Sequence, residues 1–201
     1  MSKISAYQDA LDKAIKKLKK INLSQKYIDL GLPEPENNKL KIRAFGVNFY
    51  LNLDDFEIKT DDQKKDNKIK ISDKISILHY LLTDIPIIIT GKLINFRDLS
   101  GGNFYWQPFL SRTINPLIKR IGNNIDLLKN NLNRFDWEKN DTGDFSAKIH
   151  IIGKVYIILV YYLGDEEFQP DANILFDEGI KNIFDTEDVA VLSSRICLSL
   201  L

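Results

Sequence analysis

The chain has 201 residues, enough for one domain with a full core or at most two small ones. Of these residues 44% are hydrophobic and 28% charged, values typical of a globular protein. Basic and acidic residues balance at 28 each, so the formal net charge is zero. We therefore expect no broad binding to nucleic acid or to anionic membranes, because both need a surplus of positive charge. Cys197 is the only cysteine, which excludes an intrachain disulfide and a self-contained cysteine-ligated metal or iron–sulfur site.

The chain shows no signal for membrane insertion or secretion. No apolar stretch reaches the ~20 residues that span a bilayer, and the N-terminus lacks the apolar core of a signal peptide. We expect a cytoplasmic protein with no membrane partner.

The N-terminal part predicts a helix followed by strands. Apolar residues recur at three and four positions between Tyr7 and Ile21, which is typical of an amphipathic helix. Apolar and polar residues alternate through 39–58, and Gly46 is placed to turn between two strands. The highly charged segment 59–70 is predicted to be a mobile loop.

The central part predicts a short helix, a strand and two further helices. Ser72 or Asp73 can cap a helix over ISILHYLL (75–82), and the compact apolar run 86–90 is a strand candidate. Residues 104–120 are predicted to be mainly helical, and 121–132 to form another helix.

The C-terminal part predicts a hairpin, a short strand and a last helix. Residues 145–152 and 154–162 form the hairpin around Gly153, and 173–176 form the short strand. Asp185 or Thr186 caps the last helix. This order predicts an α+β fold, a single domain over 1–201 with a mainly antiparallel sheet packed with several helices.

The segment from Gly91 to Arg120 has the most unusual composition. Arginines flank a pair of glycines followed by aromatic residues, a mixture that suits a ligand pocket or a partner surface. A tight turn followed by core aromatics is an equally good interpretation. The residues concerned are Phe96, Arg97, Gly101, Gly102, Phe104, Tyr105, Trp106, Phe109 and Arg112.

Other candidates have plainer interpretations. His79 is either a hydrogen-bonded structural histidine or a ligand of a metal or a tetrapyrrole. The acidic turn around Asp165–Glu167 is better interpreted as a solvated loop than as a cation site. Cys197 is better interpreted as a small core residue. The sequence contains none of the phosphate-loop, dinucleotide-binding, metalloprotease or hydrolase motifs.

Several segments together resemble one family, a bacterial and archaeal domain of unknown function common in anaerobes. They cover nearly the whole chain in the order of the family. The segments are FGVNFYLNLDD (45–55), ILHYLLT (77–83), GKLINFRDLSGGNFYWQPF (91–109), NPLIKRIG (115–122) and GDEEFQPDANILFD with FDTEDVAVL (within 164–192).

The resemblance implies a functional context. Some members of the family carry a four-cysteine iron–sulfur domain of the type found in corrinoid iron–sulfur proteins, and members occur beside corrinoid-dependent methyl-transfer systems. These 201 residues contain no four-cysteine domain, so we expect electron transfer to belong to a partner. The corrinoid-binding pattern DxHxxG does not occur either.

Three hypotheses follow. The first is an accessory protein that binds cobalamin, another corrinoid or a related tetrapyrrole for the storage, delivery or repair of a methyl-transfer system. In this hypothesis His79 ligates cobalt, and the aromatics cover the macrocycle while the arginines hold its polar periphery. The second is a non-catalytic docking module for a methyltransferase or an iron–sulfur protein. The third is an enzyme with a site around His79 and the acids 165–167. The cofactor-binding candidates are His79, Arg97, Phe104, Tyr105, Trp106 and Arg112.

Overall fold

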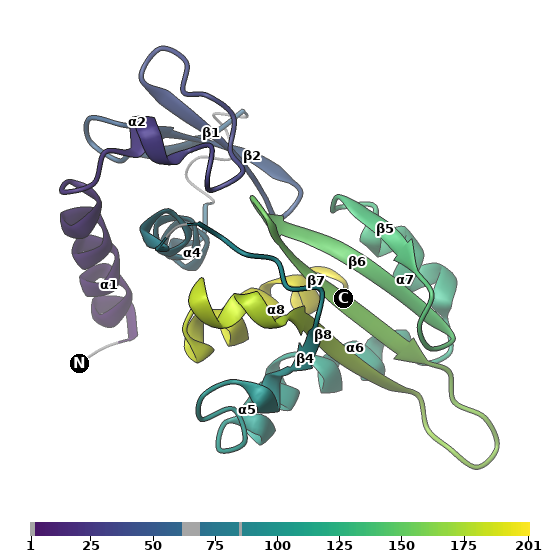
Figure 1. Ribbon diagram of the computed structural model, residues 1–201. Coiled ribbons are helices and arrows are strands. Elements are labelled where there is room, and N and C mark those ends of the chain that lie inside the picture. Colours follow the sequence, from purple (N-terminus) through teal and green to yellow (C-terminus); the bar gives the residue numbers. More distant parts are fainter. Residues whose placement is uncertain (1–2, 62–68, 85) are drawn as a thin grey trace. The chain divides into compact units, whose positions relative to one another are not determined.

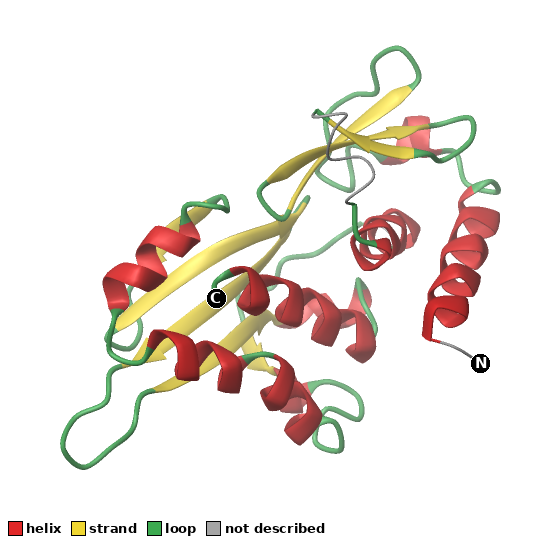
Figure 2. Ribbon diagram, turned by 180° about the vertical axis from the view of Figure 1, so that it is seen from behind, coloured by secondary structure: helices red, strands yellow, loops and turns green. Residues whose placement is uncertain are grey.

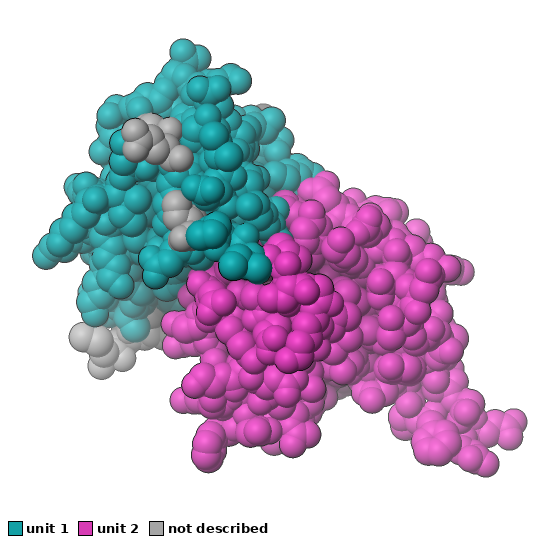
Figure 3. All heavy atoms as spheres, viewed as in Figure 1, with its two compact units in different colours: residues 1–88, 152–154 teal, residues 89–151, 155–201 magenta. Residues whose placement is uncertain are grey.

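A computed structural model describes residues 3–61, 69–84 and 86–201, with side chains except at 3–4 and 24–25. The chain folds into helices and antiparallel strands (Figure 1), which confirms the predicted α+β class. The described residues form two compact units (Figure 3). Unit 1 comprises 1–88 and 152–154, and unit 2 comprises 89–151 and 155–201.

Unit 1 contains a three-stranded antiparallel meander. Its strands are β1 (Lys39–Ala44), β2 (Val47–Asn52) and β3 (Ile58–Thr60), in the order β3-β2-β1. Alternate residues point to opposite faces of a strand, so Leu40, Ile42 and Leu51 are buried on one face. The residues between them form an outer face that is mostly charged or polar.

The helices of unit 1 are α1 (Lys3–Leu18), the short α2 (Leu23–Lys26) and α4 (Ile71–Leu82). Helices α1 and α4 pack against each other. Ala14 and Leu18 are buried on α1 at the helical spacing of four. Helix α4 is more deeply buried, with Ile77, Leu78 and Leu81 fully covered.

The tip of a long hairpin also belongs to unit 1. Ile152 pairs with Ala44 at the end of β1. The hydroxyl of Tyr80 donates a hydrogen bond to the Leu30 carbonyl and accepts one from the Lys154 backbone N–H at 3.0 Å. Burial raises the pKa of Tyr80 to about 12, so its hydroxyl keeps its proton at neutral pH.

Unit 2 is built on a sheet in the order β5-β6-β7-β8-β4. Strands β6 (Phe145–Ile152) and β7 (Val155–Tyr162) are joined by the two-residue turn at 153–154, a connection typical of antiparallel strands. Strand β8 (Asp171–Asp177) pairs with both β7 and β4 (Leu93–Asn95). The edge strand β5 (Trp137–Asn140) pairs with β6.

The helices of unit 2 pack around one another and against the sheet (Figure 2). Helix α6 (Ile114–Ile121) contacts β8 and the helices α5 (Trp106–Arg112), α7 (Ile125–Leu132) and α8 (Thr186–Ser199). Two short 3-10 helices, η1 (Phe96–Asp98) and η2 (Glu178–Asn182), complete the unit. The Asp185 carboxylate accepts a hydrogen bond from the Asp188 N–H and caps α8, which confirms that prediction.

Three predicted elements differ from the structure. The apolar run 86–90 is not a strand in its described residues, although β4 follows it. Helix α4 begins at Ile71, and Asp73 is buried inside the helix instead of capping it. Strand β3 takes up the first residues of the predicted loop 59–70, of which 62–68 lie outside the described residues. Among the described residues, no helix is long and apolar enough to cross a membrane.

Candidate functional site

The segment that carries most of the predicted site residues begins with a double cap at η1. The Asn95 side chain accepts a hydrogen bond from the Arg97 N–H at 2.8 Å, and the Asp98 carboxylate accepts one from the Asn95 N–H at 2.9 Å. Such reciprocal bonds satisfy the free N–H groups at a helix start. They fix the backbone from which Arg97 projects.

The glycine pair then closes a tight turn. A Cβ atom on Gly102 would lie 2.0 Å from the Phe96 carbonyl oxygen, so no larger residue fits there. Gly101 has a φ of +72°, a conformation that glycine adopts without strain. The Thr186 hydroxyl donates a hydrogen bond to the Ser100 carbonyl at 2.7 Å and ties this turn to α8.

The aromatic residues around the turn divide into a buried stack and an exposed group. The rings of Phe96 and Phe109 are buried and stack at a centroid distance of 4.0 Å. Trp106 stacks on Phe109 at 5.6 Å, and the Arg97 guanidinium lies 5.7 Å from the Trp106 ring, within cation–π range. Arg97 also donates to the Asn103 side chain at 2.9 Å.

Phe104 and Tyr105 face solvent. The exposed fraction is 91% for Phe104 and 62% for Tyr105. We call Arg97, Phe104, Tyr105 and Trp106 the aromatic surface. Exposed large aromatics on a backbone fixed by caps and stacking are unusual for a residue type that normally contributes to the core. The sequence left two alternatives for these aromatics, core residues or an exposed surface, and the segment contains both.

The other two predicted residues lie elsewhere. Arg112 is exposed at the end of α5. His79 is half-buried on α4 in unit 1, whereas the other five lie in unit 2. A site that combines His79 with the other five stays a prediction.

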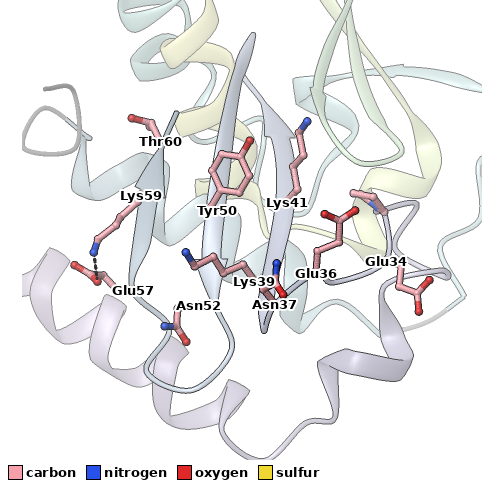
Figure 4. Close-up of a pocket in the computed structure, with 11 residues that line it drawn as sticks. Glu34, Glu36, Asn37, Lys39, Lys41, Tyr50, Asn52, Glu57, Lys59 and Thr60 are labelled. Atoms are coloured by element: carbon pink, nitrogen blue, oxygen red, sulfur yellow. Dashed lines mark ion pairs between the residues drawn. The ribbon is translucent and has the colours of Figure 1, made fainter. Parts of the chain in front are cut away.

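A second candidate site lies on the outer face of the meander in unit 1. It is a groove of about 670 Å³ (Figure 4). Cross-strand pairing places Lys41 opposite Tyr50, and Tyr50 opposite Lys59, while Lys39 pairs with Asn52. The groove is lined by three lysines, three glutamates and five other residues: Lys39, Lys41, Lys59, Glu34, Glu36, Glu57, Pro33, Asn37, Tyr50, Asn52 and Thr60.

The electrostatics of the groove centre on Tyr50. A hydrogen bond to Asp61 is the main cause that raises the pKa of Tyr50, and the nearby Glu36 carboxylate adds to it. The same bond is the main cause that lowers the pKa of Asp61, with contributions from Asn48, Lys41 and Arg43. At neutral pH the Tyr50 hydroxyl is therefore protonated and donates its hydrogen bond to the Asp61 carboxylate.

The remaining sequence candidates occupy structural roles. Burial raises the pKa of the Cys197 thiol to about 12, so it is not a nucleophile at neutral pH. The N–H groups of Phe168 and Glu167 bond to Asp165 and lower its pKa, so Asp165 is an anion rather than a proton donor. Within the described residues, no group of three or more His, Cys, Asp or Glu could hold a metal ion.

Comparison with known proteins identifies the family. A model of the domain of unknown function DUF3786 matches residues 22–199. The chain belongs to the DUF3786 family. Searches of the curated proteins and of the solved structures found no match.

The groove of this DUF3786 chain was missed by sequence reasoning. The alternation over 39–52 predicts the two strands, and their outward positions carry Lys39, Lys41 and Tyr50. Two basic residues beside an aromatic on one face of a predicted hairpin are the signal in the sequence that could have indicated this groove. Alternation could not show that β3 and the segment 33–37 also line the groove, because their place beside β1 and β2 is set by the tertiary fold.

Proposed function

We propose that this DUF3786 chain is a non-catalytic docking module whose aromatic surface binds a partner protein. The observation that carries the proposal is the 91% exposure of Phe104 beside the 62% exposure of Tyr105. Aromatic and arginine side chains dominate the binding energy of many protein interfaces. A fixed backbone lowers the entropy that binding costs.

The chemistry of the surface defines the partner. Phe104 and Tyr105 need an apolar pocket, and the guanidinium of Arg97 favours acidic groups at its rim. The resemblance to a family associated with corrinoid methyl transfer suggests a corrinoid methyltransferase or an iron–sulfur protein as the partner. Both classes are proposals that a direct binding measurement can separate.

The test compares matched aromatic substitutions. Phe104→Ala with Tyr105→Ala removes the proposed anchors, and Phe168→Ala is the control because Phe168 is 68% exposed on another loop of unit 2. We expect calorimetric titration with the purified methyltransferase and iron–sulfur protein to show binding by one of them. The double variant should bind about tenfold more weakly or worse, and the control unchanged. Equal affinity of both variants would refute the role of this surface.

Corrinoid binding is the second candidate function. It is supported by the open ring faces of Phe104 and Tyr105 next to the exposed Arg97. A visible-absorbance titration with hydroxocobalamin, with haem as the control, tests it. We expect a saturable spectral shift that is lost in His79→Ala if His79 ligates the cobalt. The absence of both a shift and co-elution would remove this candidate and leave docking.

An enzyme with His79 and the acids 165–167 is the weakest candidate. These residues belong to different units. Asp165 is also held as an anion by two backbone N–H groups.

A further inference from the structure

The outer face of the meander presents two lysines that lie two residues apart on β1. Lys39 and Lys41 are exposed and project from the same face of β1. Residues two apart on a strand are separated by about 6.6–6.8 Å along its axis, so an anion between them can be approached by both side chains. Lys59 differs, because its ammonium lies 2.9 Å from the Glu57 carboxylate.

Neither Lys39 nor Lys41 forms an ion pair within 4 Å with a described residue. Lys41 acts on Asp61 only over a longer distance. Among the described residues, an anionic ligand would therefore gain two charge partners without breaking an ion pair. Such charge-assisted contacts are stronger than neutral hydrogen bonds.

Tyr50 supplies an aromatic ring at the centre of this face. Cross-strand pairing places it between Lys41 and Lys59, and Figure 4 shows its ring on the same face as Lys39 and Lys41. The hydrogen bond to Asp61 holds the phenol. A planar ring of a ligand can stack on this side chain.

The rim of the groove supplies hydrogen-bond acceptors and amide groups. Glu36 and Asn37 line it from the segment before β1, and Asn52 lines it from β2. Three glutamates balance three lysines in the lining, so a simple polyanion does not complement the groove. Its ligand needs an anionic group together with N–H or O–H donors.

We propose that this groove binds a nucleoside monophosphate or a closely similar phosphorylated ring compound. The phosphate would lie between Lys39 and Lys41, and the base would stack on Tyr50. The ribose hydroxyls or exocyclic amino groups would donate to Glu36. The volume of about 670 Å³ lies within the ~300–1,000 Å³ of small-molecule sites.

The test is an NMR titration of the full chain, uniformly labelled with ¹⁵N, against AMP, GMP, CMP and UMP. The nucleoside of each nucleotide lacks the anion and inorganic phosphate lacks the ring, so both serve as matched probes. We expect at least one nucleotide to bind with a Kd below about 1 mM, a modest affinity for an exposed site. Shifts should map to β1–β3, and the matching nucleoside and phosphate should each bind at least about tenfold more weakly.

Four variants locate the site. Lys39→Ala with Lys41→Ala should weaken nucleotide binding at least about tenfold, and Tyr50→Ala about fivefold or more. Tyr50→Phe keeps the ring and should bind within about twofold of wild type. Lys139→Ala, an exposed strand lysine of unit 2, is the control. The same spectra report whether each variant is folded.

Each alternative result has a defined meaning. No binding by any of the four nucleotides overturns the proposal. Phosphate that binds as tightly as the nucleotides overturns the role of the ring. Shifts outside β1–β3, or affinities unchanged in both the lysine and Tyr50→Ala variants, assign binding to another place and also overturn it. Failure here leaves the docking function untouched, because the aromatic surface lies in unit 2.

Discussion

The Asp177 carboxylate, at the end of β8, ties the segment at Thr90–Gly91 to the start of η2. It accepts hydrogen bonds from the N–H groups of Thr90, Gly91 and Gly179, at 3.0, 2.7 and 2.8 Å, and from the Thr90 hydroxyl at 3.1 Å. Partial burial acts to raise the pKa of Asp177, but these hydrogen bonds together lower it below the ordinary value of 3.8. The ionised carboxylate thus anchors the segment that precedes β4.

This anchor predicts a pH-dependent stability. A lowered pKa means that the unfolded state binds the proton more readily, so the stabilisation is present above about pH 4 and is lost as pH falls through the folded-state pKa. Asp177→Asn should lose about 1–2 kcal/mol of unfolding free energy at pH 7. The difference from wild type should shrink in urea titrations at pH 3. Asp141→Asn, on an exposed loop, is the control, and a pH-independent difference for Asp177→Asn would contradict this account.

Residue-level reasoning predicted the aromatic segment but not the exposure of each ring. Phe96, Phe104 and Phe109 are chemically identical, and their spacing fits a turn followed by core residues equally well. The structure buries Phe96 and Phe109 against each other and leaves Phe104 outside. That choice depends on how each ring packs against the rest of unit 2, as in the stack of Phe96 on Phe109, and no local pattern of the sequence encodes it.

At the scale of elements, a lysine of α2 binds the C-terminal end of helix α4. The Lys26 side chain is only 8% exposed, and its ammonium donates to the carbonyls of Leu81, at 3.2 Å, and Thr83. These carbonyls lie at the C-terminal end of α4, where free acceptors and the helix dipole favour a cation. Burial lowers the pKa of Lys26, and the nearby Asp84 carboxylate opposes that effect.

We expect Lys26→Met to destabilise unit 1. Methionine fills a similar volume, but the variant leaves two carbonyls without their donor, which costs about 1–3 kcal/mol. Hydrogen exchange should show faster opening of the last turn of α4. Lys20→Met, at an exposed position just after α1, is the matched control. Unchanged thermal stability and exchange in Lys26→Met would show that the ammonium contributes nothing to the helix end.

Elements with a strong period were predicted well, and those set by tertiary contacts were not. The alternation of β1 and β2 and the turn at Gly153 appear directly in the structure. The apolar run 86–90 is not a strand, because Thr90 and Gly91 bond to the Asp177 side chain instead of joining a ladder. Strand β5 was missed because its sequence WEKN is mostly polar and it lies at an edge.

For the whole molecule, the single domain expected over 1–201 stays a prediction. The described residues group into two compact units. The chain passes from unit 1 to unit 2 after residue 88, and Ile152–Lys154 belong again to unit 1. No change of composition marks these points in the sequence. The turn at the hairpin tip is therefore an element of unit 1 that comes from a distant part of the chain.

Gly153, within this turn, provides a test of its contribution. Its φ is +52°, and an added Cβ would lie 2.1 Å from the Tyr80 hydroxyl oxygen and 2.7 Å from the Leu30 carbonyl oxygen. Gly122 has a nearly identical φ of +53° but no atom within 4 Å of an added Cβ. The two glycines share a positive φ and differ in available space.

We expect Gly122→Ala to lose about 1 kcal/mol of unfolding free energy, from backbone strain alone. Gly153→Ala should lose about 3 kcal/mol or more, because the methyl group must displace the buried Tyr80 hydroxyl from its two partners. Chemical denaturation followed by circular dichroism measures both, and hydrogen exchange should place the added loss in β1 and α4. Equal losses in the two variants would mean that the turn can move away from Tyr80 at little cost, and that unit 1 does not depend on the hairpin tip.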